Sequence, residues 1–250
     1  MDKVCVLLPA LDEGERVVAV IRGIHALELD AEVSVVVVDD GSTDDTVARA
    51  REAGARVVSL GANLGVGAAL RRGFDLARAE DFDYLVHIDA DGQIDPAQIP
   101  ALLAPVRSGA ADVAIGSRFL NGTPSYLTPW KAAALKVLAS VVGFVVDAPL
   151  TDLSCGIRCL GKAAIIVAHP RFKRDYIQET LLQFFGAGLT VVEVPVSAVA
   201  RGGCRGLSAR TFSYSIRYLL LLGFALATFQ LARIRRTLLA PLPSLRPRLR

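Results

Sequence analysis

The chain has 250 residues, enough for one large domain or a domain with an appendage, and its mean hydropathy of +0.43 is high for a purely soluble protein. Its net charge of +3 conceals a division, because residues 1–200 carry a net −7 while residues 201–250 carry +10 and no acid. The four cysteines fit no zinc-binding spacing and the N-terminus shows no signal-peptide pattern, which argues against a zinc protein or a secreted disulfide scaffold and favours reduced thiols in the cytosol.

The first half of the chain alternates short apolar runs with segments of helical spacing. Strands are predicted at residues 4–8, 33–38, 57–60, 84–88 and 113–116, and helices at about 13–27, 45–52 and 96–106. A Gly-rich turn at residues 63–69 is expected to lead into a further helix that ends at about residue 79. Pro9 is expected to stop the first strand, and Ser42 or Thr43 is expected to cap the second helix. This strand–helix order predicts an α/β fold with a mostly parallel central sheet and helices on both faces.

The second half is less regular. A long apolar helix is predicted at residues 130–146, a polar loop at 151–158, a helix at 177–185 and a strand at 191–196. Residues 218–232 carry no formal charge and would span about 22 Å as a helix, short of a bilayer's hydrocarbon core. Arginines flank that run, which favours an interfacial or partly inserted helix over a buried core helix.

The acidic stretch that follows the predicted strand at 84–88 contains Asp89 and Asp91. In extended backbone this spacing of two places both carboxylates on one face, about 6–7 Å apart. Carboxylates that close repel unless a cation lies between them, and Mg²⁺ or Mn²⁺ binds such sites together with substrate phosphates. The stretch therefore predicts a metal–diphosphate site, with an ordinary strand-to-turn junction as the alternative.

Five motifs in a fixed order, each after a predicted strand, give the chain a resemblance to a known family. They are residues 9–13 (PALDE), 39–44 (DDGSTD), 63–68 (NLGVGA), 89–93 (DADGQ) and 116–119 (GSRF). Their order resembles glycosyltransferase family 2, and within it the polyprenyl-phosphate branch of dolichyl-phosphate mannose synthases and their bacterial relatives. The match covers residues 4 to about 200.

The resemblance implies a GT-A, Rossmann-like nucleotide-diphospho-sugar transferase fold. It implies inverting, metal-dependent transfer of mannose or glucose from a GDP- or UDP-sugar to a polyprenyl monophosphate of dolichyl or undecaprenyl type. Asp91, Arg118 and Asp89 become the expected catalytic residues, and Asp91, with Gln93 as a second ligand, would hold Mg²⁺ or Mn²⁺. The expected nucleotide-sugar contacts are Pro9, Leu11, Glu13, Val38, Asp40, Asp89, Ala90, Asp91 and Arg118. The structural alternatives are a helix cap for Asp40's loop and a surface salt bridge for Arg118.

The acceptor side of the resemblance rests on fewer residues. The expected acceptor and sugar contacts are Asp152, Arg158, Asp175, Arg201, Arg205 and Ser208. The branch's lysine after this serine is replaced here by Ala209, so one of the nearby arginines would supply the cation. A phosphate acceptor is already anionic and needs no strong base, whereas a hydroxyl acceptor would need Asp152, Asp175 or Glu179 as a base.

These interpretations divide the chain into a catalytic domain (1–212), a membrane-associating helical segment (213–240) and a disordered basic tail (241–250). The expected partners are a nucleotide-sugar, a lipid phosphate and a membrane surface with anionic lipids at the cytoplasmic face of the cell membrane. Two alternatives stay open: a transferase acting on a soluble or glycan hydroxyl, and a non-catalytic nucleotide-sugar-binding adaptor. A nucleic-acid partner is not expected, because the basic tail lacks interleaved aromatic residues.

Overall fold

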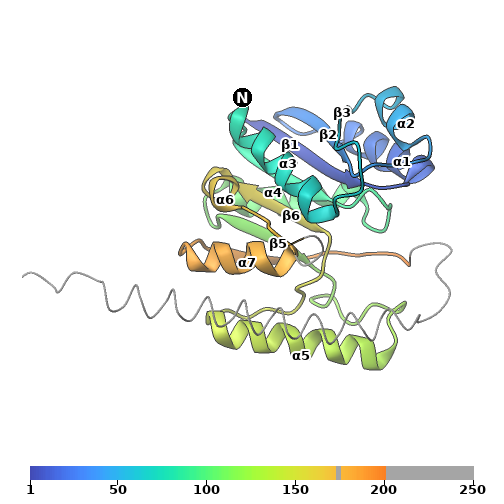
Figure 1. The fold of residues 1–250 in the computed structure, drawn as a ribbon. Helices are drawn as coiled ribbons and strands as arrows, with labels where there is room; N and C mark the ends of the chain where they lie inside the picture. Colours follow the sequence, from blue (N-terminus) through green and yellow to red (C-terminus); the bar gives the residue numbers. More distant parts are fainter. Residues whose placement is uncertain (173–175, 201–250) are drawn as a thin grey trace, which may run out of the picture.

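A computed structural model of the chain describes residues 1–172 and 176–200 (Figure 1). Within these ranges, seven strands form one sheet in the order β3-β2-β1-β4-β6-β5-β7. The strands are β1 (Lys3–Ala10), β2 (Glu32–Asp39), β3 (Arg56–Ser59), β4 (Tyr84–Ile88), β5 (Val113–Ser117), β6 (Ile157–Gly161) and β7 (Val191–Pro195). All neighbouring pairs are parallel except those that β6 makes with β4 and β5.

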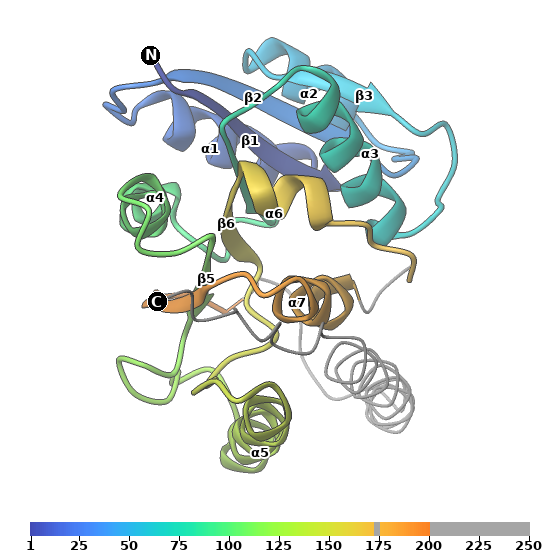
Figure 2. The ribbon, with the colours of Figure 1, turned by 90° about the vertical axis from the view of Figure 1, so that its left-hand side faces the viewer.

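Helices cover both faces of this sheet (Figure 2). They are α1 (Gly14–His25), α2 (Thr46–Glu52), α3 (Val66–Ala79), the 3-10 turn η1 (Pro96–Gln98), α4 (Ile99–Arg107), α5 (Pro129–Val146), α6 (Lys162–Val167) and α7 (Tyr176–Gly186). The helices α1, α2 and α4 pack on one face, while α3, α6, α7 and one side of α5 pack on the other. In β1, for example, Val4 and Val6 face the first cluster and Cys5 and Leu7 face the second. A strand covered on both sides has no polar face, which is why its sequence is continuously apolar.

The α/β fold predicted from the sequence is confirmed, and the elements of the first half match their predicted ranges closely. One boundary is wrong: β1 continues through Pro9 to Ala10 and pairs Pro9 with Val38 of β2. On its other side β1 pairs with β4 only from Val4 to Leu7. Pro9 therefore lies beyond the shorter neighbour, where its missing N–H is not needed for the ladder.

The predicted loop at residues 151–158 is partly wrong, because its end belongs to β6. That strand runs antiparallel between β4 and β5, and the helix α6 that follows it was also not predicted. Five residues that include Arg158 and Gly161 give no clear strand pattern, although all five are buried. The insertion matters for function, because it brings the loop before β6 to the carboxyl end of β4.

The expected cap of α2 is also wrong. The residue before this helix is Asp45, and neither Ser42 nor Thr43 caps it. Instead Oγ of Ser42 accepts a hydrogen bond from the backbone N–H of Asp12, 3.0 Å away. These residues connect two loops rather than ending a helix.

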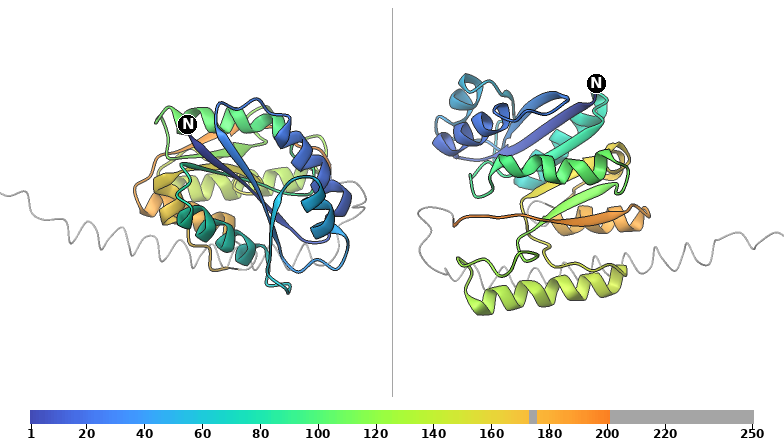
Figure 3. Two further views of the ribbon diagram at one scale, coloured as in Figure 1. Left: turned by 90° about the horizontal axis from the view of Figure 1, so that it is seen from above. Right: turned by 180° about the vertical axis from the view of Figure 1, so that it is seen from behind.

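Helix α5 lies at the margin of the molecule, on the far side of α7 from strands β1 to β3 (Figure 3). Among the described residues it is the one helix long and apolar enough to cross a membrane by length and composition. The predicted segments at 213–240 and 241–250 fall outside the described residues. The described cysteines are buried and unpaired, and burial raises the pKa of the Cys5 and Cys155 thiols to about 12.

Candidate active site

The polar motifs meet at the carboxyl edge of the sheet. Strands β1, β2 and β4 run parallel, so the loops that follow them leave the sheet on the same side. Open α/β sheets bind ligands in this position, because backbone and side-chain polar groups there are not used by the ladder. The site is described below from the β1 end toward β7.

The loops after β1 and β2 are held together by side-chain hydrogen bonds to backbone. Asp12 Oδ1 accepts from the backbone N–H of Thr43 at 2.8 Å, and Thr46 Oγ1 accepts from the N–H of Glu13 at 2.8 Å. Glu13 is almost buried, and its Oε2 lies 2.7 Å from Nη1 of Arg16. Of the other residues predicted to contact nucleotide here, Leu11 is half-buried, whereas Pro9 and Val38 are buried within their strands.

Asp40 organises the Gly-rich turn that leads into α3. Its side chain is buried, and Oδ1 accepts from the backbone N–H groups of Leu64 at 2.8 Å and Gly65 at 3.0 Å. Gly65 has φ 95°, a conformation that glycine adopts without steric cost. A buried carboxylate at a strand end thus fixes a loop whose backbone lies beside the site.

Its neighbour Asp39 is held in its ionised form. Burial, the largest single influence, raises its pKa, but hydrogen bonds from Ser42 and Ser59 together outweigh burial and leave the pKa below its ordinary value. Oδ2 of Asp39 lies 2.6 Å from Oγ of Ser59 on β3. Asp39 therefore connects the ends of β2 and β3.

The acidic pair follows β4 as predicted. The carboxylate of Asp89 is 41% exposed, and Nε2 of His87 lies 3.3 Å from its Oδ1. The backbone N–H of Asp89 donates to the carbonyl of Gly156 at 3.1 Å, and a Cβ on Gly156 would lie 1.8 Å from Oδ2 of Asp89. In its present rotamer the Asp89 carboxylate leaves no room for a side chain at position 156.

Asp91 is half-buried and its Oδ1 accepts from the backbone N–H of Gln93 at 3.0 Å, while Ala90 between the two acids is buried. The described residues contain no cluster of three or more His, Cys, Asp or Glu side chains that could enclose a metal ion. Two exposed or half-buried carboxylates fit a hard cation that takes its remaining ligands from water and a diphosphate. The side-chain nitrogen of Gln93 donates to the carbonyl of Val199 at 2.9 Å, so its part as a ligand stays a prediction.

Arg118 follows β5 and forms a buried pair with Asp152. Its Nε and Nη2 donate to the two carboxylate oxygens at 2.7 and 2.9 Å, and Nη2 also donates to Oγ of Ser154 at 2.6 Å. The side chains are 15% and 0% exposed. Burial lowers the pKa of the Arg118 guanidinium, but the Asp152 carboxylate more than compensates and leaves it above its ordinary value. The guanidinium therefore stays charged inside the protein, held against the Asp152 carboxylate.

Glu193 of β7 holds the backbone of the loop that carries Asp152. Its Oε1 accepts from the backbone N–H groups of Thr151 at 2.8 Å and Asp152 at 2.9 Å, and its Oε2 accepts from the Thr151 hydroxyl. That hydroxyl lies 2.6 Å from the Ser117 hydroxyl at the end of β5. The network joins β5, β7 and the loop before β6.

The remaining acceptor-side predictions have different outcomes. Arg158 is buried in β6, and its guanidinium donates to the backbone carbonyls of Ile177 and Leu153. These contacts favour a structural role for Arg158 over a direct contact with phosphate. Glu179 accepts from the backbone N–H groups of Arg171 and Phe172. Asp175, Arg201, Arg205 and Ser208 lie outside the described residues.

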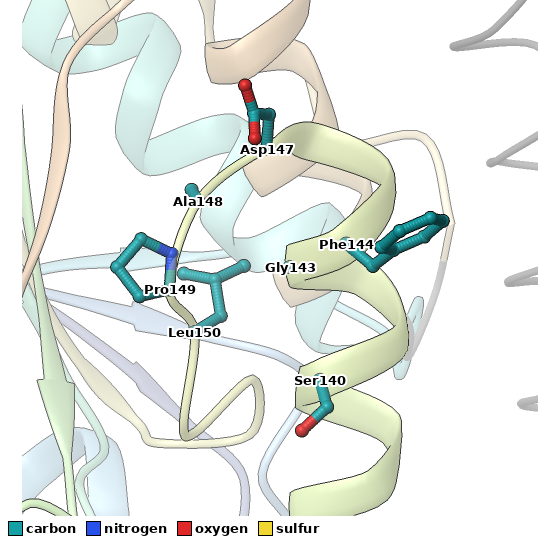
Figure 4. Close-up of a pocket in the computed structure, with 7 residues that line it drawn as sticks. All are labelled: Ser140, Gly143, Phe144, Asp147, Ala148, Pro149 and Leu150. Carbon is teal, nitrogen blue, oxygen red and sulfur yellow. The ribbon is translucent and has the colours of Figure 1, made fainter.

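A hollow of about 360 Å³ lies elsewhere, between the C-terminal part of α5 and the segment that follows it (Figure 4). Its lining residues are Ser140, Gly143, Phe144, Asp147, Ala148, Pro149 and Leu150. None of these residues belongs to the carboxyl edge of the strands. The strand-end carboxylates, rather than this hollow, mark the candidate donor site.

Sequence reasoning did not single out several residues that shape the site. His87 was read as part of an apolar strand, and Thr151 and Ser154 as ordinary loop positions. The signal available for His87 was a titratable side chain two residues before a carboxylate on the same strand face. Thr151 and Ser154 had no local signal, because their partners are far away in the sequence.

The sheet order and the strand-end carboxylates define a GT-A type α/β protein of the nucleotide-diphospho-sugar transferase class. The model of glycosyl transferase family 2 matches residues 5–182, and the chain belongs to that family. The fold and family predicted from the sequence motifs are therefore confirmed, and glycosyltransferase activity is the enzyme class that this family supports.

Relatives in the family include lipid-phosphate enzymes. The chain is 30% identical over 207 residues to the polyprenol monophosphomannose synthase of Mycolicibacterium smegmatis, covering 78% of this chain and 77% of that one. It is 31% identical over 180 residues to the undecaprenyl-phosphate mannosyltransferase of Micrococcus luteus, covering 68% and 73%. The resemblance to the polyprenyl-phosphate branch is thus confirmed at the level of named relatives.

The solved structures similar to this chain include several of a glucosyl-3-phosphoglycerate synthase. The crystal structure of glucosyl-3-phosphoglycerate synthase from Mycobacterium tuberculosis with UDP has a TM-score of 0.68 and 25% identity, covering 91% of this chain and 80% of that one. A second structure of that enzyme, at 24% identity and TM-score 0.68, contains Mn²⁺, UDP-glucose and phosphoglyceric acid. It covers 91% of this chain and 79% of that one.

Proposed function

We propose that this chain transfers a hexose from a GDP- or UDP-sugar to a polyprenyl monophosphate, with inversion and with Mg²⁺ or Mn²⁺. The polyprenyl-phosphate relatives support the acceptor, and the UDP complex of the related fold supports a nucleotide donor. The observation that carries the proposal is the contact of Asp89 with Gly156, because Gly156 belongs to the loop whose Asp152 holds Arg118. Asp89 on the donor side and Arg118 on the acceptor side thus both contact the loop that precedes β6.

The donor side is assigned to the strands β1 to β4. The turn held by Asp40 presents backbone to the nucleotide, and Asp91 with Asp89 would hold the divalent cation. That cation would neutralise the charge that develops on the departing nucleoside diphosphate. The protein's own contribution is to fix both carboxylates against Gly156 and the Gln93 backbone, so that little reorganisation is needed.

Arg118 is assigned to a phosphate. Its three side-chain hydrogen bonds use Nε and Nη2, and among the described residues none engages Nη1. A guanidinium has five N–H donors, so one edge is held by Asp152 while the Nη1 end keeps two donors for a phosphate oxygen. Asp152 acts here as a positioning residue for Arg118.

The hydrogen bonds of the candidate bases favour a phosphate acceptor over a hydroxyl. Asp152 is buried against Arg118, and Glu179 accepts from two backbone N–H groups. Carboxylates whose oxygens already hold other groups are poorly placed to take a proton from a substrate hydroxyl. A phosphate monoester is largely ionised near neutral pH and requires positioning instead of deprotonation.

The direct test uses the full chain with GDP- and UDP-hexoses, Mg²⁺ or Mn²⁺, and polyprenyl phosphate in detergent. A labelled sugar in the chloroform phase is the expected result. Phosphoglyceric acid and a sugar hydroxyl serve as competing acceptors in parallel reactions. Transfer to either of these, with no chloroform-soluble product from any common hexose donor, would contradict the proposed acceptor.

We place the reaction at the cytoplasmic face of the membrane, where nucleotide-sugars are made available.

A further inference from the structure

Helix α5 has two apolar sides, and the described residues of the protein cover only one of them. Ala132, Ala139 and Val142 are buried against the body of the molecule. On the opposite side Trp130 is 53% exposed, Val137 63%, Val141 46% and Phe144 89%. These four residues recur at spacings of seven, four and three, which places them on one helical stripe. Figure 4 shows Phe144 directed away from the segment that follows the helix.

The charged side chains on helix α5 itself, Lys131 and Lys136, are both positive. The nearest acid along the chain is Asp147, exposed just after the C-terminal end of the helix, although residues 1–200 as a whole carry a net −7. Lys131 and Lys136 are both exposed and lie in the N-terminal half of α5. An apolar stripe beside lysines is the pattern of a helix that lies in the interface of an anionic bilayer.

The position of α5 in the chain connects it with the site. The helix begins eleven residues after Arg118 and ends six residues before Asp152. The segment that contains α5 is therefore anchored at both ends by the buried pair. We infer that the stripe formed by Trp130, Val137, Val141 and Phe144 binds the surface of an anionic lipid bilayer, with α5 lying parallel to it. The opposite side of the helix stays packed on the protein, so α5 does not cross the bilayer. Docking of α5 would also bring Arg118 toward a lipid phosphate. Only this last step rests on the proposed function.

The chain provides its own probe, because Trp130 is its single tryptophan. The full chain is mixed with vesicles of phosphatidylcholine and phosphatidylglycerol, and Trp130 emission is recorded. We expect a blue shift, protection from acrylamide, and stronger quenching by a spin label near the head group than by one at the chain end. Emission that stays unchanged while the chain sediments with the vesicles would overturn the inference. Emission already blue and protected without lipid would also overturn it, since another part of the chain or a second copy would then cover the stripe.

A double variant, Val137→Asn with Phe144→Asn, tests the energy of this surface. We expect the vesicle partition constant to fall about tenfold, because two apolar side chains lose their burial in lipid. The matched control is Ile166→Asn on α6, which is 57% exposed and lies off the stripe, and it should leave partition unchanged. None of these measurements requires turnover. A chain that shows the Trp130 response without making lipid-linked sugar would contradict the proposed function but still support membrane binding by this stripe.

A separate observation concerns the buried histidine behind Asp89. His87 is 1% exposed, and its ring packs edge-on against that of Tyr176, with centroids 5.8 Å apart and planes at 74°. Its Nε2 lies 3.3 Å from Oδ1 of Asp89 but is too poorly aligned for a hydrogen bond, and it has no other partner among the described residues. A buried donor without a partner is costly, so such an atom indicates a group that completes its bond in another state.

The two oxygens of Asp89 have different surroundings. Oδ2 is pressed against Gly156, whereas Oδ1 faces Nε2 of His87. We propose that His87 is a positioning residue that donates to Asp89 when donor and cation are bound and so fixes the rotamer of that carboxylate. This second inference rests on the proposed function, because Asp89 is assigned there to the donor.

The test compares His87→Phe, which keeps a ring beside Tyr176, with His87→Gln, which keeps a side-chain N–H. Binding of GDP and of UDP with Mn²⁺ is measured by calorimetry. We expect His87→Phe to weaken binding about tenfold and His87→Gln to restore most of it, with thermal midpoints close to that of the parent chain. Equal binding by all three chains would overturn the inference. Absence of nucleotide binding by the parent chain would instead contradict the proposed function.

Discussion

The two halves of the sheet hold their loops by different means. On the β1 to β4 side, loops are tied by carboxylates and hydroxyls that accept from backbone N–H groups, as Asp40 does from Leu64 and Gly65. On the β5 to β7 side Glu193 also accepts from backbone N–H groups, but the loop before β6 is in addition tied by a buried charged pair, Arg118 with Asp152. In the proposed function the β1 to β4 side would bind the nucleotide-sugar and the β5 to β7 side the phosphate acceptor, so we name them the donor half and the acceptor half. The comparison predicts that loop stability in the first half depends on hydrogen bonds to backbone, and in the second half on keeping the buried charges paired.

The largest effect is expected where the halves meet. Asp89→Asn combined with Asp91→Asn should reduce turnover about 10³-fold, because the cation loses its protein ligands and leaving-group charge is no longer neutralised. The same double variant should lose the thermal stabilisation that a nucleoside diphosphate gives in the presence of Mn²⁺. The control is Asp95→Asn, an exposed acid in the same turn that caps η1. An unchanged thermal shift in the double variant would count against the assignment of the site.

The acceptor half can be broken at its buried pair. Asp152→Asn should lower the free energy of unfolding by about 3–5 kcal/mol, because the Arg118 charge stays buried without its partner. Urea denaturation measures this change. Glu80→Gln, which removes an exposed ion pair with Arg56, is the matched control and should cost about 1 kcal/mol or less. Equal losses of unfolding free energy in the two variants would show that the buried pair matters no more than an exposed one.

The donor half can be tested at the Gly-rich turn. Asp40→Asn should cost about 2 kcal/mol of unfolding free energy, since the hydrogen bonds to Leu64 and Gly65 lose their charged acceptor. Nucleotide affinity should fall as well, because the turn is no longer fixed. Asp45→Asn removes an exposed i,i+4 pair with Arg49 and controls for loss of an acid. Normal affinity in Asp40→Asn would separate this turn from the donor site.

The smallest effect has a characteristic pH dependence. The pKa of Asp39 lies below its ordinary value of 3.8, so its stabilising contribution is present above that value and disappears as the pH falls through the folded-state pKa. Ser59→Ala removes one donor to Asp39 and should cost about 1 kcal/mol at neutral pH. Urea denaturation across the acid range should show the difference between variant and parent narrowing below that ordinary value. A difference that stays constant with pH would mean that Ser59 acts through packing alone.

Much of the donor half was predictable from local pattern. Continuous β-branched runs predict strands buried on both faces, and β2 and β4 appear where those runs stand. Parallel strands end at one edge of a sheet, which is why Asp40, Asp89 and Asp91 lie on the same side. The boundary at Pro9 was missed, since it depends on the length of the neighbouring strand.

Sequence by itself determined the α/β class, the family and the strand-end acids, because each depends on residues close together in the chain. Tertiary structure decided the antiparallel insertion of β6, the fit of Asp89 on Gly156 and the pairing of Arg118 with Asp152. These partners are separated by 67 and 34 residues, and such contacts leave no periodic trace in the sequence. It also decided that the described residues leave one apolar side of α5 exposed, since composition alone cannot tell a core helix from a helix with an exposed apolar side.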